Sequence, residues 1–353
     1  MSFYNWQATF SRQTGSQGEF CIVIGGKGIG KTFGLRLQCV RDFIKGGFRF
    51  VELSRTKDET KSVMVGYFDR LHDCGYFKDY VFKTEKNAGY IALKPKDETE
   101  KPNWSLCCYF VALTVFQREK KRTYSNVKRV IFDEAIIDSK DRYHRYLPNE
   151  FFILANILDS IFREQPNDKP IYRVYLLGNS CNLVNPYLQH LGVNRQPEYG
   201  YSFFNDKHTL LHYVEPMDAA ERQAHTLVGR MLSGTDESDM IYNNKFETGN
   251  DDDIEQKPSN AKFAYGLKYL KRDFGIWTDY KNGLIYVTNW IPKDSRTVYA
   301  LTKRDSTLNY ALIQRNSKLM QALANIAWSG GLRYQDVATR EMFWKLLELL
   351  GVK

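Results

Sequence analysis

Residues 25–32, near the N-terminus, have the types and the spacing of a phosphate-binding loop. They fit the pattern G-x-x-x-x-G-K-[ST] and lie between an apolar stretch and a helical pattern. Glycines let backbone N–H groups turn toward a phosphate, Lys31 can reach the β- and γ-phosphates, and the Thr32 hydroxyl can bind Mg²⁺. We therefore expect ATP and Mg²⁺ at this loop. The expected nucleotide contacts are Gly25, Gly26, Lys27, Gly28, Ile29, Gly30, Lys31 and Thr32.

A dinucleotide-binding loop is the alternative interpretation, because Gly28, Gly30 and Gly34 are spaced as G-x-G-x-x-x-G. That alternative leaves the Lys-Thr pair unexplained. It also needs an acidic residue at the end of the next apolar strand, whereas Glu52 lies inside that strand. The sequence therefore favours the phosphate loop.

A second chemical feature is the pair Asp133-Glu134, which follows a short apolar run at 130–132. At the tip of a buried strand, Asp133 is expected to hold Mg²⁺ directly or through water. Glu134 is expected on the opposite side of the strand, where it would polarise the attacking water. Adjacent acids also occur on ordinary solvated turns, but after a phosphate loop they are typical of ATPases with an additional catalytic glutamate, such as helicases and translocases.

Two further polar residues follow apolar segments. Arg163 ends the helical pattern at 151–162, where it could stabilise transition-state charge on a neighbouring subunit's nucleotide or simply complement the helix dipole. Asn179 follows a strand pattern at 172–177, where it could sense the γ-phosphate or simply form a turn. The residues alone leave both pairs of alternatives open.

The elements that must position these residues alternate between strand and helix. Strand patterns separated by helical ones indicate βαβ units and a mainly parallel sheet, which is an α/β fold. We expect strands at 20–24, 48–53, 130–132 and 172–177, and helices at 34–44 and 151–162.

The last hundred residues have a different pattern, with closely spaced strands first and helices after them, which indicates an α+β domain. Asn282-Gly283 is a strong hairpin signal between two of the strands. We expect strands at 263–270, 274–280, 284–290 and 298–301, and helices around 308–328 and 337–350.

Composition and charge divide the chain of 353 residues into three parts. The net charge of +9 favours a polyanionic partner, and it is distributed as +7 over residues 1–216, −6 over 217–253 and +8 over 254–353. The acidic part is expected to be a linker or small lid between two domains; the alternative is a long surface loop within one domain.

The sequence also excludes several classes of protein. No apolar run approaches the length of a membrane span, and the N-terminus does not have the pattern of a signal peptide. The six cysteines form no Cys-x-x-Cys pair, which argues against structural zinc and favours a reducing cytoplasm. Acidic residues of the last domain are scattered, and its first strand carries Lys268 rather than an acid, so we expect no nuclease activity.

Basic residues are candidates for contacts with DNA or with a neighbouring subunit's ATP. Arg55 and Lys57 follow the second strand, and Lys120, Lys121 and Arg122 form a basic run. A solvated surface is the alternative interpretation for both groups.

The order of these motifs resembles that of the genome-packaging (DNA encapsidation) ATPases of small short-tailed bacteriophages with protein-primed linear double-stranded DNA. The matching landmarks are residues 23–32, 130–134, 146–150, 160–163, 178–180, 184–187, 229–230 and 274–277. The resemblance implies a P-loop ATPase domain of the ASCE type over 1–216 and an RNase H-like, nucleic-acid-binding domain without nuclease activity over 254–353. It also implies that Arg163 acts in trans. Asn179 is the candidate coupling residue because of its position after a strand, and not because of the resemblance.

The function implied by the resemblance is that of a terminase-like motor subunit. It would use ATP to translocate viral double-stranded DNA through the portal into a preformed procapsid. Its implied partners are DNA, the portal or connector, a structural packaging RNA in some members, and copies of itself in a ring, expected to be a homopentamer. It would act in the host bacterial cytoplasm and transiently on the portal vertex, with no place in the mature virion. The alternatives are another ASCE-type translocase or helicase, or a scaffold with a decayed nucleotide site.

Overall fold

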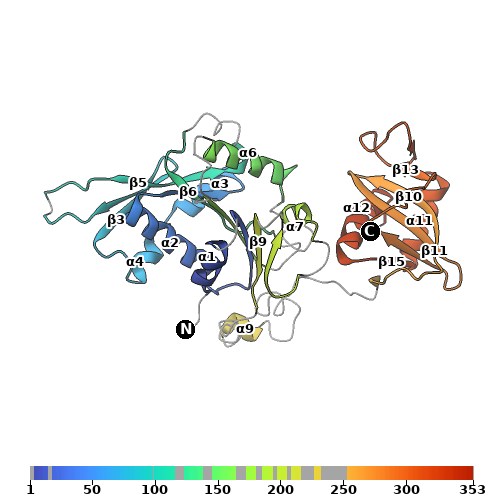
Figure 1. Ribbon diagram of the computed structural model, residues 1–353, viewed down its shortest axis with the longest axis horizontal. Helices are drawn as coiled ribbons and strands as arrows, with labels where there is room; N and C mark the ends of the chain where they lie inside the picture. The colour runs from blue at the N-terminus through green and yellow to red at the C-terminus, as the bar shows by residue number, and fades with distance from the viewer. Residues whose placement is uncertain are drawn as a thin grey trace. The chain divides into compact units, whose positions relative to one another are not determined.

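The structure is a computed structural model that describes residues 4–14, 18–97, 99–115, 123–137, 145–163, 172–179, 185–193, 197–204, 208–215, 226–231 and 253–352. The chain divides into two compact units, one of residues 1–191 and 197–247 and one of 192–196 and 248–353 (Figure 1). This division lies inside the expected linker 217–253, of which residues 226–231, with the short helix α9 (Leu227–Met231), and residue 253 are described. The three-part organisation stays a prediction.

The first unit is built on a nine-stranded sheet, as far as the chain is described, in the order β3-β4-β5-β2-β6-β7-β1-β9-β8. The six strands from β5 to β9 in this order are parallel to one another, and antiparallel strands flank them at both edges. The expected mainly parallel α/β sheet is therefore confirmed. The strands are β1 (Phe20–Ile24), β2 (Arg49–Ser54), β3 (Tyr80–Glu85), β4 (Ala88–Leu93), β5 (Ser105–Ala112), β6 (Val127–Phe132), β7 (Arg173–Gly178), β8 (Gly200–Phe204) and β9 (Thr209–Tyr213).

The strand order decides which loops meet. In a parallel sheet the carboxyl ends of the strands share one edge, and ligands bind outside that edge. The phosphate loop follows β1, Asp133 and Glu134 follow β6, and Asn179 follows β7. Because β7 lies between β1 and β6, Asn179 is placed between the loop and the acidic pair.

Helices cover both faces of this sheet, with α1 and α2 on one side and α6 on the other (Figure 1). The helix α2 turns Leu35, Leu37 and Val40 inward, and α6 turns Leu154, Ile157 and Ile161 inward, as their apolar spacing predicts. The helical elements are α1 (Trp6–Thr14), α2 (Lys31–Gly46), α3 (Lys57–Met64), α4 (Asp69–Asp73), the 3₁₀ turn η1 (Leu113–Val115), α6 (Glu150–Phe162) and α7 (Pro186–His190).

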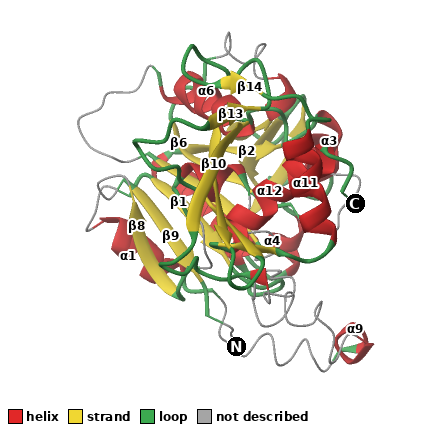
Figure 2. Ribbon diagram, turned by 90° about the vertical axis from the view of Figure 1, so that its right-hand side faces the viewer, coloured by secondary structure: helices red, strands yellow, loops and turns green. Residues whose placement is uncertain are grey.

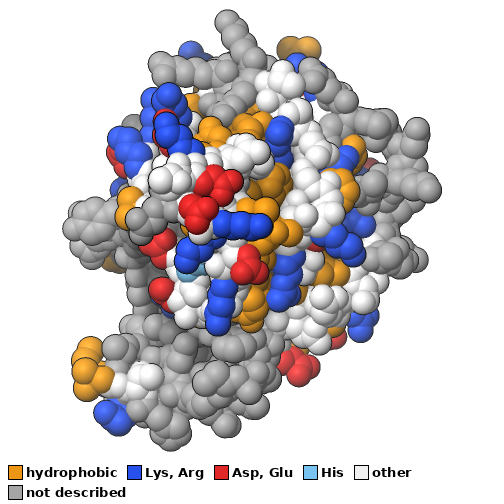
Figure 3. Space-filling model, turned by 90° about the vertical axis from the view of Figure 1, so that its left-hand side faces the viewer, with side chains coloured by type: hydrophobic (Ala, Val, Ile, Leu, Met, Phe, Trp, Pro, Cys, Tyr) orange, Lys and Arg blue, Asp and Glu red, His pale blue; other side chains and the backbone are white. Residues whose placement is uncertain are grey.

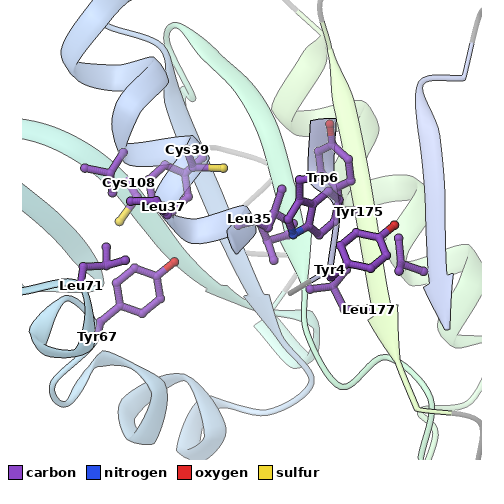
Figure 4. Packing of buried hydrophobic residues seen from close by; sticks show 14 of the residues in the cluster. Tyr4, Trp6, Leu35, Leu37, Cys39, Tyr67, Leu71, Cys108, Tyr175 and Leu177 are labelled. Atoms are coloured by element: carbon purple, nitrogen blue, oxygen red, sulfur yellow. The ribbon is translucent and has the colours of Figure 1, made fainter. Parts of the chain in front are cut away.

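The N-terminal segment, in which no helix or strand was expected, contacts the phosphate loop. The backbone N–H of Tyr4 donates to the carbonyl of Ile29 at 2.8 Å, and the Trp6 indole donates to the carbonyl of Lys31 at 2.9 Å. A Cβ on Gly34 would lie 2.6 Å from the Trp6 ring, so the ring can pack here only against glycine. Figure 4 shows Tyr4 and Trp6 beside Leu35, Tyr175 and Leu177 in the core.

The outer surface of this unit carries both signs of charge. Figure 3 shows the face at the left of Figure 1, near β3 and β5, where basic and acidic side chains lie close together around a strip of apolar ones. Such a mixture is typical of a solvated protein surface. None of the helices in the described ranges is long and apolar enough to cross a membrane.

The second unit contains a six-stranded sheet, within its described residues, in the order β14-β13-β10-β11-β12-β15. Figure 2 labels three of these strands, β10, β13 and β14, and the helices α11 and α12. β10, β11 and β12 form an antiparallel meander, and β13 and β14 join the β10 side in parallel. The elements are β10 (Lys262–Tyr269), β11 (Arg272–Asp279), β12 (Leu284–Thr288), β13 (Val298–Ala300), β14 (Ala311–Leu312), α11 (Lys318–Trp328), β15 (Leu332–Tyr334) and α12 (Val337–Leu349).

The expected α+β pattern and the hairpin at Asn282-Gly283 are both present in this unit. The first of the two expected helices is shorter than predicted. It begins at Lys318, because Ser317 caps it by accepting the N–H of Met320, and the chain before it pairs as β14. Residues of both helices, including Leu323 and Phe343, share one core with Leu267 and Ile276 of the sheet.

Candidate nucleotide-binding site

The carboxyl ends of β1, β6 and β7 meet at one pocket of about 430 Å³. The phosphate loop, both acids of the pair and the predicted coupling residue all line it, as their positions on the sheet require. Its lining residues are Lys27, Gly28, Ile29, Gly30, Lys31, Thr32, Phe33, Arg70, Cys74, Tyr76, Asp133, Glu134, Gly178 and Asn179. Two other predicted loop residues, Gly25 and Gly26, form the base of the loop, where their carbonyls accept from Lys31.

The backbone of the loop has the conformation that its glycines allow. Gly28 and Gly30 have φ angles of 77° and 88°, in the left-handed region that side chains disfavour. Gly30 is also the N-cap of α2, so the helix begins directly at Lys31. The first turn of a 16-residue helix thus opens into the pocket, where the partial positive charge of the helix N-terminus favours an anion.

Lys31 is only 7% exposed, and its ammonium lies at the base of the loop. It donates to the carbonyls of Gly25 and Gly26 at 2.6 and 2.8 Å and lies 3.3 Å from Asn179 Oδ1. Phosphate oxygens entering the loop would compete for this ammonium as stronger, charged acceptors. The contact places the Asn179 carboxamide beside the Lys31 ammonium.

Asp133 and Glu134 line the same pocket, which differs from the expectation that Glu134 lies on the opposite side of the strand. β6 ends at Phe132, so the alternation of side chains along a strand does not extend to these residues. Glu134 has a left-handed φ of 51°, and its N–H donates to Asp133 Oδ1 at 3.0 Å. The turn directs both residues toward the pocket.

The donor set suits a hard divalent cation. The carboxylate of Asp133 and the hydroxyl of Thr32 both line the pocket, and Mg²⁺ prefers a few such oxygen ligands together with phosphate oxygens. One oxygen of Asp133 accepts a backbone N–H, and the carboxylate, with two lone pairs on each oxygen, can still bind a cation.

A buried acid lies close behind this pair. Glu52 of β2 accepts hydrogen bonds from Arg36 Nη2 at 2.5 Å and from the Tyr67 hydroxyl at 2.7 Å. Burial raises the pKa of Glu52, Arg36 lowers it in part, and the nearby Asp133 carboxylate raises it further. Through Arg36 of α2 and Glu52 of β2, this ion pair joins the helix of the phosphate loop to the middle of the sheet.

Five pocket residues were not predicted as site residues from the sequence. One is Gly178, next to Asn179, and the others are Phe33, Arg70, Cys74 and Tyr76. The Phe33 and Tyr76 rings lie 5.9 Å apart, and the Arg70 guanidinium lies 5.7 Å from the Phe33 ring. Their approach depends on how α4 folds back toward α2, for which no local sequence pattern exists.

Arg163 lies apart from this pocket in its own chain. It follows the last residue of α6, its side chain is 57% exposed, and its Nη2 pairs with Asp159 at 2.9 Å. Lys57, the first residue of α3, is also exposed. The remaining candidates, Lys120, Lys121 and Arg122, lie outside the described residues.

The structure corrects the interpretation of Arg55. This residue is 5% exposed, and its guanidinium is enclosed by Glu150 and by the carbonyls of residues 134 and 135. A side chain so enclosed cannot grip DNA or reach a neighbouring subunit's ATP. The sequence could not pair Arg55 with Glu150, because the two residues lie 95 positions apart.

Comparisons with known proteins identify the family that this chain matches. The family described as Podovirus DNA encapsidation protein (Gp16) matches residues 2–352. The DNA packaging protein of Bacillus phage B103 is 30% identical over 284 residues, which is 80% of this chain and 82% of that protein. The DNA packaging protein of Bacillus phage phi29 is 28% identical over 334 residues, 94% of each chain.

Two solved structures have a similar fold over nearly the whole chain. A chain of the bacteriophage Phi-29 viral genome packaging motor assembly superimposes with a TM-score of 0.77 at 26% identity, over 99% of this chain and 100% of that one. A chain of the Phi-28 gp11 DNA packaging motor has a TM-score of 0.59 at 18% identity and covers 97% of both chains. The second likeness concerns the fold alone.

Proposed function

The chain belongs to the family of podovirus DNA encapsidation proteins (Gp16), and on this basis we propose that it is an ATP-driven motor subunit that moves viral double-stranded DNA through the portal into a preformed procapsid. The family resemblance seen in the sequence landmarks is confirmed by this match over residues 2–352. The observation that supports the proposal most directly is the pocket in which Lys31, Asp133 and Glu134 meet.

The proposed division of labour follows from the positions of the side chains. Lys31 and the N–H groups of the loop bind the β- and γ-phosphates, while Thr32 and Asp133 hold Mg²⁺, which neutralises phosphate charge when bound. Glu134 accepts a proton from the water that attacks the γ-phosphorus, and Asn179 reports the loss of the γ-phosphate. The aromatic part of the pocket, with Phe33 and Tyr76, receives the base and ribose.

The strand order supports the assignment to the ASCE type of P-loop ATPase. A strand inserted between the phosphate-loop strand and the acidic strand leaves room beside the γ-phosphate for a second acid and a water. In the second unit, an antiparallel meander extended by two parallel strands supports the proposal of an RNase H-like domain. We propose that this domain binds nucleic acid without cutting it.

Arg163 is proposed to act on the ATP of a neighbouring subunit in a ring. We propose that this ring is a homopentamer. Its exposure at the end of α6 and its distance from its own pocket lining support a role outside its own subunit. Transition-state charge on the γ-phosphate would be neutralised by such an arginine.

The Arg163→Ala variant is expected to bind ATP normally and to fail in turnover by the assembled ring. Mixing it with the Glu134→Gln variant should restore part of the activity, since some interfaces then combine an intact Arg163 with an intact Glu134. The measurement is ATP hydrolysis against mixing ratio. The control is Asp159→Asn, which removes the ion-pair partner of Arg163 and should leave turnover within about threefold. Absence of restored activity at every ratio would assign Arg163 a structural role.

The second unit is expected to bind double-stranded DNA with a steep dependence on salt. Its residues from 254 onward have a net charge of +8, and each phosphate contact contributes about −0.9 to the slope of log affinity against log salt. Fluorescence anisotropy of labelled DNA with this unit measures that slope. Binding that is absent or independent of salt would contradict the proposed role, and metal-dependent nicking would contradict the expected lack of cleavage.

The function as a whole is tested by protection of DNA from added nuclease in the presence of procapsids. Protection that requires both ATP and this protein is the expected result. Strand separation in place of protection would favour the helicase alternative, and protection without hydrolysis would favour a scaffold. The same assay with and without a structural packaging RNA tests whether this RNA is a partner.

A further inference from the structure

A buried arginine lies directly behind the turn that carries Glu134. Arg55 follows β2, and its side chain is 6% exposed. Its Nε and Nη2 donate to the two carboxylate oxygens of Glu150, at 2.9 and 3.0 Å. This fork geometry is specific to arginine, since a lysine ammonium has no planar pair of donors.

The same guanidinium also holds the backbone of the turn. Nη2 donates to the carbonyl of Ala135 at 2.9 Å, and Nη1 lies 3.4 Å from the carbonyl of Glu134. On the other side, the N–H of Ala135 donates to the carbonyl of Leu177 at 2.8 Å. The peptide that follows the Glu134 Cα is thus bonded at its carbonyl and at its N–H.

These bonds matter because Glu134 has a disfavoured backbone conformation. Its φ of 51° lies in the left-handed region, which residues other than glycine adopt rarely and keep only when their surroundings fix it. If the turn relaxed toward a right-handed conformation, the direction of the Glu134 side chain would change. The bonds of Arg55 to the two carbonyls of this turn oppose that change.

Glu150 in turn fixes Arg55. It is the first residue of α6, it is buried, and it accepts hydrogen bonds from the Tyr187 hydroxyl at 2.5 Å and from the N–H of Leu147 at 2.8 Å. Its carboxylate therefore has a set position from which it orients the arginine. The rings of Phe132 and Tyr146 lie 5.2 and 5.3 Å from the guanidinium.

We propose that Arg55, oriented by Glu150, is a positioning residue that fixes the direction of the Glu134 carboxylate toward the attacking water. Arg55 is absent from the pocket lining, so it acts through the backbone of the turn. The inference rests on the proposed function, in which Glu134 activates water.

The test is ATP turnover by the full-length chain without DNA, together with the affinity for a slowly hydrolysed ATP analogue. In Arg55→Lys, which keeps the charge but not the fork, kcat is expected to fall about 10- to 100-fold because the carboxylate is misaligned. The Kd for the analogue is expected to stay within about threefold, because the phosphate loop is untouched. A paired variant, Arg55→Met with Glu150→Leu, leaves no unpaired buried charge and should show the same kcat loss in a folded protein.

The matched control is Arg340→Lys, which changes a buried arginine paired with Asp253 in the second unit. It should leave kcat unchanged. In a Glu134→Gln background, Arg55→Lys should have no further effect, because the direction of residue 134 no longer matters.

Three results would overturn the proposal. They are a kcat within about threefold of the unmodified protein in both Arg55 variants, a parallel loss of analogue binding, and full additivity with Glu134→Gln. If Glu134→Gln itself keeps normal turnover, the proposed role of Glu134 fails instead. If Arg55 instead contacts DNA, both Arg55 variants should have normal turnover without DNA, which is the first of these results.

Discussion

Replacing Lys31 with alanine is expected to abolish ATP turnover, with a fall of about 10³-fold or more. The ammonium is held at the base of the phosphate loop by the carbonyls of Gly25 and Gly26, so its position is fixed before nucleotide binds. Preorganised charge of a buried side chain aimed at a phosphate is worth about 10²–10³-fold for a single donor, and more when the donor also binds the ground state. The measurement is steady-state phosphate release at saturating ATP and Mg²⁺.

The loop contains a matched control. Lys27 lines the same pocket but is exposed, whereas Lys31 is buried. Lys27→Ala is expected to weaken ATP binding by only a few-fold, since an exposed ammonium is screened by solvent. If Lys31→Ala keeps normal hydrolysis, residues 25–32 do not form the catalytic phosphate site.

The sequence predicted this loop because its information is local. The motif, the strand before it and the helix after it are contiguous, and the structure places β1 at Phe20–Ile24, the residues expected from the apolar run. The predicted neighbours Asp133 and Asn179 also meet the loop, because parallel strands bring their carboxyl ends to one edge. Because of this topology, short sequence patterns were enough to predict a site whose residues run from Lys27 to Asn179.

The parts that sequence reasoning missed depend on contacts between distant segments. Arg55 looked like a surface charge after a strand, and only the position of α6 shows that Glu150 neutralises it. The flanking strand pairs, β3 with β4 and β8 with β9, have weak alternation, and their identity comes from pairing with the central strands. Trp6 is an aromatic residue in a polar segment, and no sequence pattern predicts its contact with Gly34.

The placement of Glu134 shows how a local rule fails at a functional site. Alternation along a strand predicts that consecutive side chains point to opposite faces. The strand ends one residue before the acidic pair, and the left-handed turn at Glu134 brings both acids to one pocket. A sequence gives no sign of such a conformation when the residue is not glycine, because the contacts that fix it come from β2 and β7.

The Glu134→Gln variant is expected to bind ATP and Mg²⁺ normally and to hydrolyse ATP about 10²–10⁴-fold more slowly. Loss of a general base typically has an effect of this size, and glutamine keeps the size of the side chain and its turn while it loses basicity. Asp133 is unchanged in this variant and keeps its carboxylate for the cation, and one of its oxygens accepts the backbone N–H of residue 134 in either protein. Analogue binding and single-turnover hydrolysis measure the two effects separately.

The paired variant Asp133→Asn should show the reverse, with nucleotide affinity lost together with its dependence on Mg²⁺. If Glu134→Gln instead loses nucleotide binding and Asp133→Asn keeps it, then the acid at the strand end is the base and the acid in the turn holds the metal.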